Sequence, residues 1–147
     1  MLSKITNEYK VFRAAPHNMQ VLLATNMLYA LVLPIVEVFV GAYIMRNTSS
    51  PAFVALYQLA MYVGIVFTSV INGYLLKHFR VNHLYMIGIL ISGMSMVGMM
   101  MISQLGVAEL AIAGFAMGAA SGFFWTNRYL LALNSTNDDN RNYFFGL

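Results

Sequence analysis

A basic break interrupts the apolar sequence near its middle and reads Gly73-Tyr74-Leu75-Leu76-Lys77-His78-Phe79-Arg80-Val81-Asn82-His83-Leu84. It carries two cations, two histidines and an asparagine, with no acidic residue, and a long apolar run lies on each side of it. Short basic loops between membrane-length segments usually stay in the cytoplasm. The break therefore predicts a membrane protein, and it sets the orientation of the other segments.

The composition supports the membrane class. Of the 147 residues, 60% are hydrophobic and 9% are charged, whereas about a quarter of a soluble domain is charged. The absence of cysteine excludes a disulfide framework, a thiolate metal site and a cysteine nucleophile. The net charge of +3 comes from cations that membrane-length segments separate, so it does not support nucleic-acid binding.

Four apolar runs are long enough to cross a bilayer, for which about 20 helical residues suffice. They occupy residues 21–45, 53–76, 84–103 and 107–133. We therefore expect an all-α fold, a polytopic membrane bundle of four transmembrane helices.

The two ends of the chain are more polar than the spans. Residues 1–20 have apolar positions at three- and four-residue spacing, which predicts a cytoplasmic amphipathic helix or, alternatively, a frayed basic terminus. Residues 134–147 are a polar loop followed by an apolar stretch that begins like a fifth helix. We expect a larger protein to continue from it; the alternative is a short interfacial tail.

The cations are distributed unevenly about the predicted spans. Seven of the eight fall on one side, and Arg46 falls on the other. Because cytoplasmic loops are enriched in lysine and arginine, both termini are expected in the cytoplasm. We expect a multi-pass protein of the plasma membrane, specifically the bacterial inner membrane.

Three polar residues inside the spans are candidates for handling a substrate or a proton: Glu37, Asn26 and Arg128. A carboxylate at membrane depth is costly, so by default it faces a bundle interior or a watery cavity. Glu37 could bind and release a proton there, or it could only hydrogen-bond another helix. Interhelical hydrogen bonding explains Asn26 and Asn72, and snorkelling to the inner headgroups is the alternative for Arg128.

A stripe of small residues marks the fourth span. Gly114, Gly118 and Gly122 are spaced by four, which strips one helix face of side chains so that another backbone can approach it. Gly64 belongs to a similar stripe on the second span. We expect these glycines to serve helix packing.

The sequence contains no HExxH motif, nucleophile elbow or Walker sequence. We therefore expect no enzymatic activity, no catalytic residue, no cofactor and no metal site. The expected partners are the lipid bilayer, a small-molecule or ion substrate, and either further transporter helices or a second copy of the chain.

The basic break matches part of a known loop signature, Gly-x-Leu-Ala-Asp-Arg-x-Gly-Arg-Arg. Gly73 and Leu75 fit it, whereas Lys77 stands in place of the aspartate and Arg80 in place of the second glycine.

Two further stretches complete the pattern: a first helix that contains Pro34, and a glycine-rich fourth helix with an arginine-led exit at Arg141. Together the three stretches resemble the major facilitator superfamily of secondary transporters. The resemblance implies the N-terminal portion of such a transporter, helices 1–4 and the start of helix 5, forming part of one of two bundles. It does not imply antiport, because the fourth-helix arginine of drug/proton antiporters is missing.

Two other classes of protein fit the sequence. One is a complete four-helix exporter that dimerises, like the small multidrug-resistance proteins, which also place a glutamate in the first helix. The other is a structural membrane subunit without transport activity. The longer polar N-terminus and the apparent start of a fifth helix favour the major-facilitator interpretation over the dimeric exporter.

Overall fold

The computed structural model describes residues 13, 17–102 and 104–135. It has four long helices, α2 (His17–Thr48), α3 (Pro51–Leu75), α4 (Val81–Met101) and α5 (Val107–Ser135). Each is long and apolar enough to cross a membrane. The expected all-α four-helix bundle is confirmed, and the chain has the make-up of a multi-pass membrane protein. The expected fifth helix and most of the expected amphipathic N-terminus lie outside the described residues.

The first helix is longer at both ends than the apolar run that predicted it. It begins at His17 and ends at Thr48, because hydropathy marks the lipid-compatible part of a helix while its hydrogen-bond ladder continues through polar residues. Near its end, Asn47 Nδ2 donates to the Tyr43 carbonyl and Thr48 Oγ1 to the Ile44 carbonyl, each at 2.8 Å.

A tight turn connects α2 to α3. Ser49 adopts a left-handed conformation (φ 53°), and its N–H donates to the Met45 carbonyl at 2.9 Å. This geometry closes the C-terminus of a helix. Pro51 then begins α3, where its fixed φ and missing N–H are tolerated.

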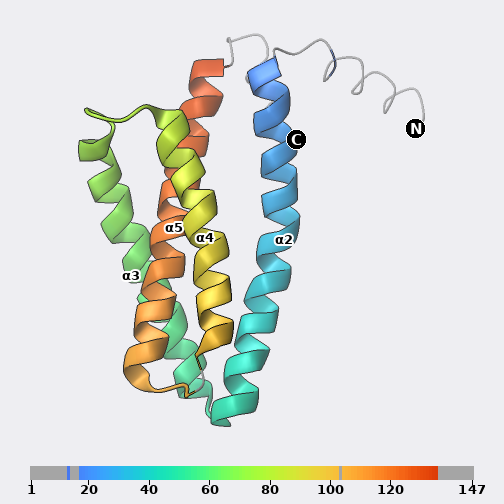
Figure 1. Ribbon diagram of the computed structural model, residues 1–147, viewed down its shortest axis with the longest axis vertical. Coiled ribbons are helices and arrows are strands. Elements are labelled where there is room, and N and C mark those ends of the chain that lie inside the picture. Colours follow the sequence, from blue (N-terminus) through green and yellow to red (C-terminus); the bar gives the residue numbers. More distant parts are fainter. Residues whose placement is uncertain (1–12, 14–16, 103, 136–147) are drawn as a thin grey trace.

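Helix α5 lies between α3 and α4 and contacts both along its length (Figure 1). The glycine stripe faces α3. A Cβ on Gly118 would collide with the Met61 carbonyl oxygen, and one on Gly122 would lie 3.0 Å from the Ile65 carbonyl oxygen. Gly114 makes the same close approach one turn earlier. The two backbones can therefore pack this closely only because these positions lack side chains.

Helix α3 contributes its own glycine to this contact. A Cβ on Gly64 would collide with the Phe115 carbonyl and lie 2.9 Å from the Ala119 nitrogen. On the other side of α5, a Cβ on Gly88 of α4 would lie 2.8 Å from the Phe124 nitrogen. Both neighbours of α5 thus reach its backbone at a glycine.

A buried pair of amides also joins α3 to α5. Asn127 Nδ2 donates to Asn72 Oδ1 at 2.9 Å, and Asn72 Nδ2 donates to Asn127 Oδ1 at 3.3 Å. Asn127 Nδ2 also donates to the Phe123 carbonyl at 2.8 Å. Because both side chains are fully buried, the pair fixes how α3 and α5 are aligned.

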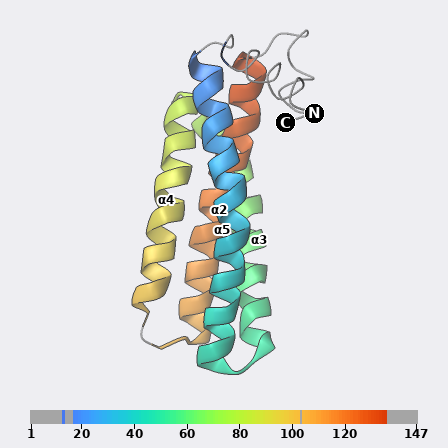
Figure 2. The ribbon, with the colours of Figure 1, turned by 90° about the vertical axis from the view of Figure 1, so that its right-hand side faces the viewer.

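Helix α2 is attached to the rest of the bundle by its first turns, by the Tyr29 ring and again near Ile44. Its first turns pack in a cluster with α4 and α5, and Ile44 packs in a second cluster with α3, α4 and α5. Between Leu23 and Ile44, a segment that the structure describes completely, no residue is buried. Figure 1 shows α2 beside the other three helices, and Figure 2 shows it in front of α5, between α4 and α3.

We predict that Gly118→Leu disrupts the bundle, because the new side chain must displace the α3 backbone at Met61. Overpacking of a core typically costs about 1–3 kcal/mol, and the loss should reach the upper end of that range or prevent folding. The measurement is the unfolding midpoint in detergent. Gly98→Leu on α4 is the matched control, because nothing lies within 4 Å of a Cβ there. Equal stability of the two variants would contradict the contact.

Candidate functional site

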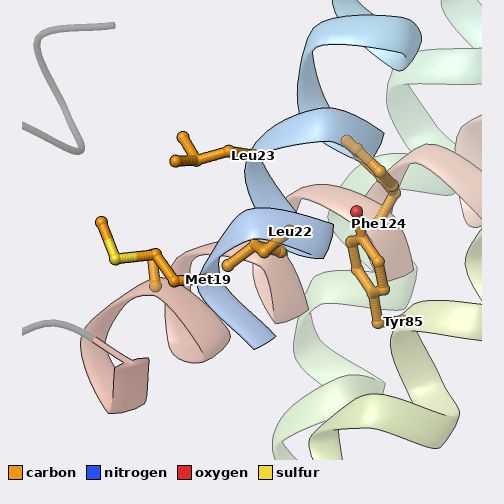
Figure 3. Close-up of a cluster of buried hydrophobic side chains, with 6 residues drawn as sticks. Met19, Leu22, Leu23, Tyr85 and Phe124 are labelled. Atoms are coloured by element: carbon orange, nitrogen blue, oxygen red, sulfur yellow. The ribbon is translucent and has the colours of Figure 1, made fainter. Parts of the chain in front are cut away.

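Three stacked aromatic rings join α2, α4 and α5. Phe124 of α5 is fully buried, and the Tyr29 ring of α2 stacks on it with a centroid distance of 3.7 Å. The Tyr85 ring of α4 stacks on Phe124 at 5.1 Å. Trp125 meets both Tyr29 and Phe124 edge-on, at 6.2 and 5.4 Å. Figure 3 shows Tyr85 and Phe124 beside Leu22, one of the residues by which α2 packs here.

The helices bring these rings together for simple geometric reasons. Residues three or four apart share a helix face, so Leu22, Asn26 and Tyr29 form one stripe of α2 that faces the bundle. On α5, Phe124 and Arg128 are likewise neighbours on one face. Because α2 and α5 run in opposite directions (Figure 1), the turn of α2 before Tyr29 lies at the level of the turn of α5 after Phe124.

Arg128 lies beside this aromatic stack. Its guanidinium carbon is 5.0 Å from the centroid of the Trp125 ring and 5.4 Å from that of Tyr129. Its Nε is buried without a hydrogen-bond partner. In the described part of the chain the acidic residues are Glu37 and Glu109. Glu109 lies 19 positions earlier on the same helix, about 28 Å away at 1.5 Å per residue.

Four buried polar atoms in the described residues have no hydrogen-bond partner: Asn26 Oδ1, Tyr29 Oη, Tyr85 Oη and Arg128 Nε. We call these four residues the polar cluster. The Tyr85 hydroxyl interacts electrostatically with Arg128 and Tyr29 and lies beside the Thr25 hydroxyl. The Thr25 hydroxyl donates to the Val21 carbonyl at 2.8 Å and retains the capacity to accept a hydrogen bond. A buried polar group without a hydrogen bond lowers the stability of the fold by about 1–3 kcal/mol. Native proteins contain few such groups.

The polar cluster lies near the end of the bundle that carries the basic turn. Tyr85 is four residues after the start of α4, and Arg128 is seven residues before the end of α5. These spacings correspond to about 6 and 10 Å along the helices. An aqueous solute or a lipid headgroup would reach the polar cluster from that end.

Two of the three polar candidates from the sequence belong to the polar cluster. Arg128 interacts electrostatically with Tyr85, and Asn26 lies one turn before Tyr29 on the same face of α2. Glu37 lies elsewhere. It is exposed on α2 and interacts electrostatically with Tyr57 of α3, which packs in the cluster at the opposite end of the bundle. These four helices alone do not enclose Glu37, because the middle of α2 is uncovered.

The loop-signature residues are not members of the polar cluster. Gly73 and Leu75 belong to the last turn of α3, and Lys77 and Arg80 are exposed in and beside the turn that follows. Lys77 Nζ lies 5.5 Å from the centroid of the Tyr74 ring.

The sequence did not single out Tyr29 or Tyr85. Tyr29 carried a usable signal, because it lies three residues after Asn26 and so shares its helix face. Tyr85 carried none, since only the close approach of α4 to α5 at Gly88 brings it to Phe124.

We predict that Tyr29→Ala lowers the stability of the bundle by about 2 kcal/mol. Truncating a fully buried aromatic costs about 3–5 kcal/mol, and Tyr29 is only half-buried. The Tyr29→Phe variant retains the stack and should remain within about 1 kcal/mol of the parent. Detergent unfolding measures both variants. Tyr62→Ala, at a 63% exposed position of α3, is the control, and a similar loss there would argue against the stack as an anchor of α2.

Comparisons of the chain with protein-family models, curated proteins and solved structures find no match.

Proposed function

We propose that the chain is part of a secondary transporter for a small solute, of the major-facilitator type, in a bacterial inner membrane. The observation that carries the proposal is the polar cluster. Ionisable and polar groups buried at membrane depth are costly, and they typically mark substrate or ion pathways. Here α2, α4 and α5 each place such groups at one level without satisfying them.

The attachment of α2 also supports transport. Transporters of this type rock helix bundles around a fixed central site. Helix α2 packs at its ends and leaves its middle unburied, so its position relative to α3–α5 depends on few contacts. Segments with few buried apolar contacts are those that open or move most readily.

Further helices would have to complete a transport path. Glu37 is exposed on the uncovered middle of α2, and a carboxylate facing lipid is unfavourable. Helices of the same protein, or of a second copy, would cover this face. Under the major-facilitator interpretation they belong to the opposing bundle.

The second candidate function is a dimeric four-helix exporter. The exposure of Glu37 on α2 favours it specifically, because a second copy could place its own α2 there and enclose two carboxylates. Flux from the 147-residue chain alone would favour this candidate over the first.

We predict that the turn between α3 and α4 is cytoplasmic, from the distribution of cations. The chain has no cysteine, so a single Asn82→Cys variant can be labelled selectively in intact cells. It should react with a membrane-impermeant maleimide only after the cells are opened. Gln104→Cys, exposed between α4 and α5, should react from outside. The reverse result would overturn the orientation.

We predict that Glu37→Gln abolishes proton-coupled flux or shifts its pH dependence without affecting insertion, because it removes an ionisable group at membrane depth. Proteoliposomes with an imposed pH gradient would hold either the complete product of the reading frame or residues 1–147 alone. We expect saturable flux of a small solute only from the complete product.

Glu109→Gln is the matched control, since Glu109 lies exposed in the first turn of α5. An unchanged pH profile in Glu37→Gln would leave Glu37 a packing role only. Absence of saturable flux from every preparation would contradict transport.

A further inference from the structure

We propose that the polar cluster binds one anionic group, a carboxylate or a phosphate-type oxyanion, held between α2, α4 and α5. The inference rests on the proposed function and deepens it, because it names the charge class of the solute. Three features support it: the hydrogen-bond donors of the cluster, the positive charge of Arg128, and the stacked aromatic rings that hold the donors.

Three of the four buried atoms without a hydrogen-bond partner belong to groups that can donate a hydrogen bond. The guanidinium of Arg128 is a donor only and remains charged in proteins. The hydroxyls of Tyr29 and Tyr85 each have one O–H that can donate a hydrogen bond. Asn26 Oδ1 is an acceptor, and it suits a hydroxyl or ammonium elsewhere on the same ligand. Three donors and one acceptor match an oxyanion that carries one donor group of its own.

The charge of Arg128 favours an anion over a cation as the occupant. Neither Glu37 nor Glu109, the acidic residues in the described part of the chain, lies near Arg128. Arg128 is half-buried with a buried Nε, and its charge would repel a second cation placed beside it and attract an anion. The stacking of Arg128 on Trp125 provides a cation–π attraction but leaves Nε without an acceptor.

The stacked aromatic rings hold the hydrogen-bond donors in place before a ligand binds. Phe124 contacts the rings of both Tyr29 and Tyr85. Tyr85 is only 8% exposed, and its hydroxyl is one of the buried atoms without a hydrogen-bond partner. Because these rings are fixed by packing, little side-chain entropy remains to be lost on binding.

The anion could belong to a free solute or to a lipid headgroup, since the polar cluster lies near one end of the bundle. Both sources present the same oxyanion chemistry. The experiment therefore needs one arm for each source.

Trp125 is the one tryptophan of the chain and lies over Arg128, so its fluorescence reports directly on the site. The purified 147-residue chain in uncharged detergent is titrated with sodium phosphate and with sodium acetate, against sodium chloride at matched ionic strength. In the lipid arm, nanodiscs of phosphatidylcholine alone are compared with nanodiscs that also contain phosphatidylglycerol.

We expect a saturable change in Trp125 emission. Arg128→Gln should abolish it, while Arg80→Gln, the same charge change in the exposed turn, should not. Tyr85→Phe retains the ring and should weaken binding about tenfold, the effect of losing one hydrogen bond to a charged group. Tyr74→Phe, at a 67% exposed position, is its control. Tyr85→Phe also keeps the test decisive if Arg128→Gln fails to fold, which circular dichroism would reveal.

A response to phosphate or acetate supports a free anion, and a response confined to phosphatidylglycerol supports a lipid phosphate; both support the anion site. A response that persists in Arg128→Gln, or no response in either arm, overturns it. Binding without flux in proteoliposomes would contradict transport but leave the anion site standing. Flux without any Trp125 response would contradict the anion site alone.

Discussion

The close contact of α5 with α3 is the constraint on which the rest of the structure depends. Lipid chains are as apolar as leucine, so helices in a bilayer associate through van der Waals contact and interhelical hydrogen bonds. The glycines of α5 allow the first, because a Cβ at Gly118 would collide with the α3 backbone. The Asn72–Asn127 pair provides the second. With α3 fixed on one side of α5, Phe124 and Arg128 remain available to α4 and α2.

The same packing explains why the polar cluster lies where α2 is attached. The α3–α5 and α4–α5 contacts use small residues and bring backbones together, whereas α2 packs through large side chains at its two ends. One of these attachments is the stack of Tyr29 on Phe124. A ligand that bridges Tyr29 to Tyr85 and Arg128 would strengthen this attachment. Its binding would therefore favour the arrangement in which α2 is docked, since a ligand shifts an equilibrium by its differential affinity for the two states.

Much of this architecture could be predicted from the sequence because the bilayer imposes it. Four runs of about 20 apolar residues require four helices, and the spacing of Gly114, Gly118 and Gly122 indicated a close helix contact before the identity of its partner was known. Asn26 and Arg128 could be singled out in the sequence because polar groups inside spans are rare. The helix ends were missed by three or four residues at both ends of α2, since polar residues continue a helix beyond the apolar run.

The roles of Asn127 and Tyr85 could not be predicted, because they depend on which helices meet. Asn127 and Tyr85 are ordinary residues in the sequence, and their roles come from Asn72 and Phe124, 55 and 39 positions away along the chain. The position of Glu37 could not be predicted for the same reason. A carboxylate in a span indicates that something polar should face it, but not whether the chain itself provides that group.

Helix α2 carries both of the features that these four helices leave incomplete. Tyr29 belongs to the polar cluster, and Glu37 lies eight residues later, about 12 Å further along the helix axis.

Pro34 lies between them within a continuous helix. A proline removes the hydrogen bond to the carbonyl four residues before it, here that of Ala30, next to Tyr29. The helix is thus weakest between its two polar positions, in the segment where no residue is buried. A bend there would move Glu37 relative to Tyr29 without breaking the stack on Phe124. Under the proposed function, such a bend would link proton uptake at Glu37 to anion binding at the polar cluster without direct contact between Glu37 and Arg128.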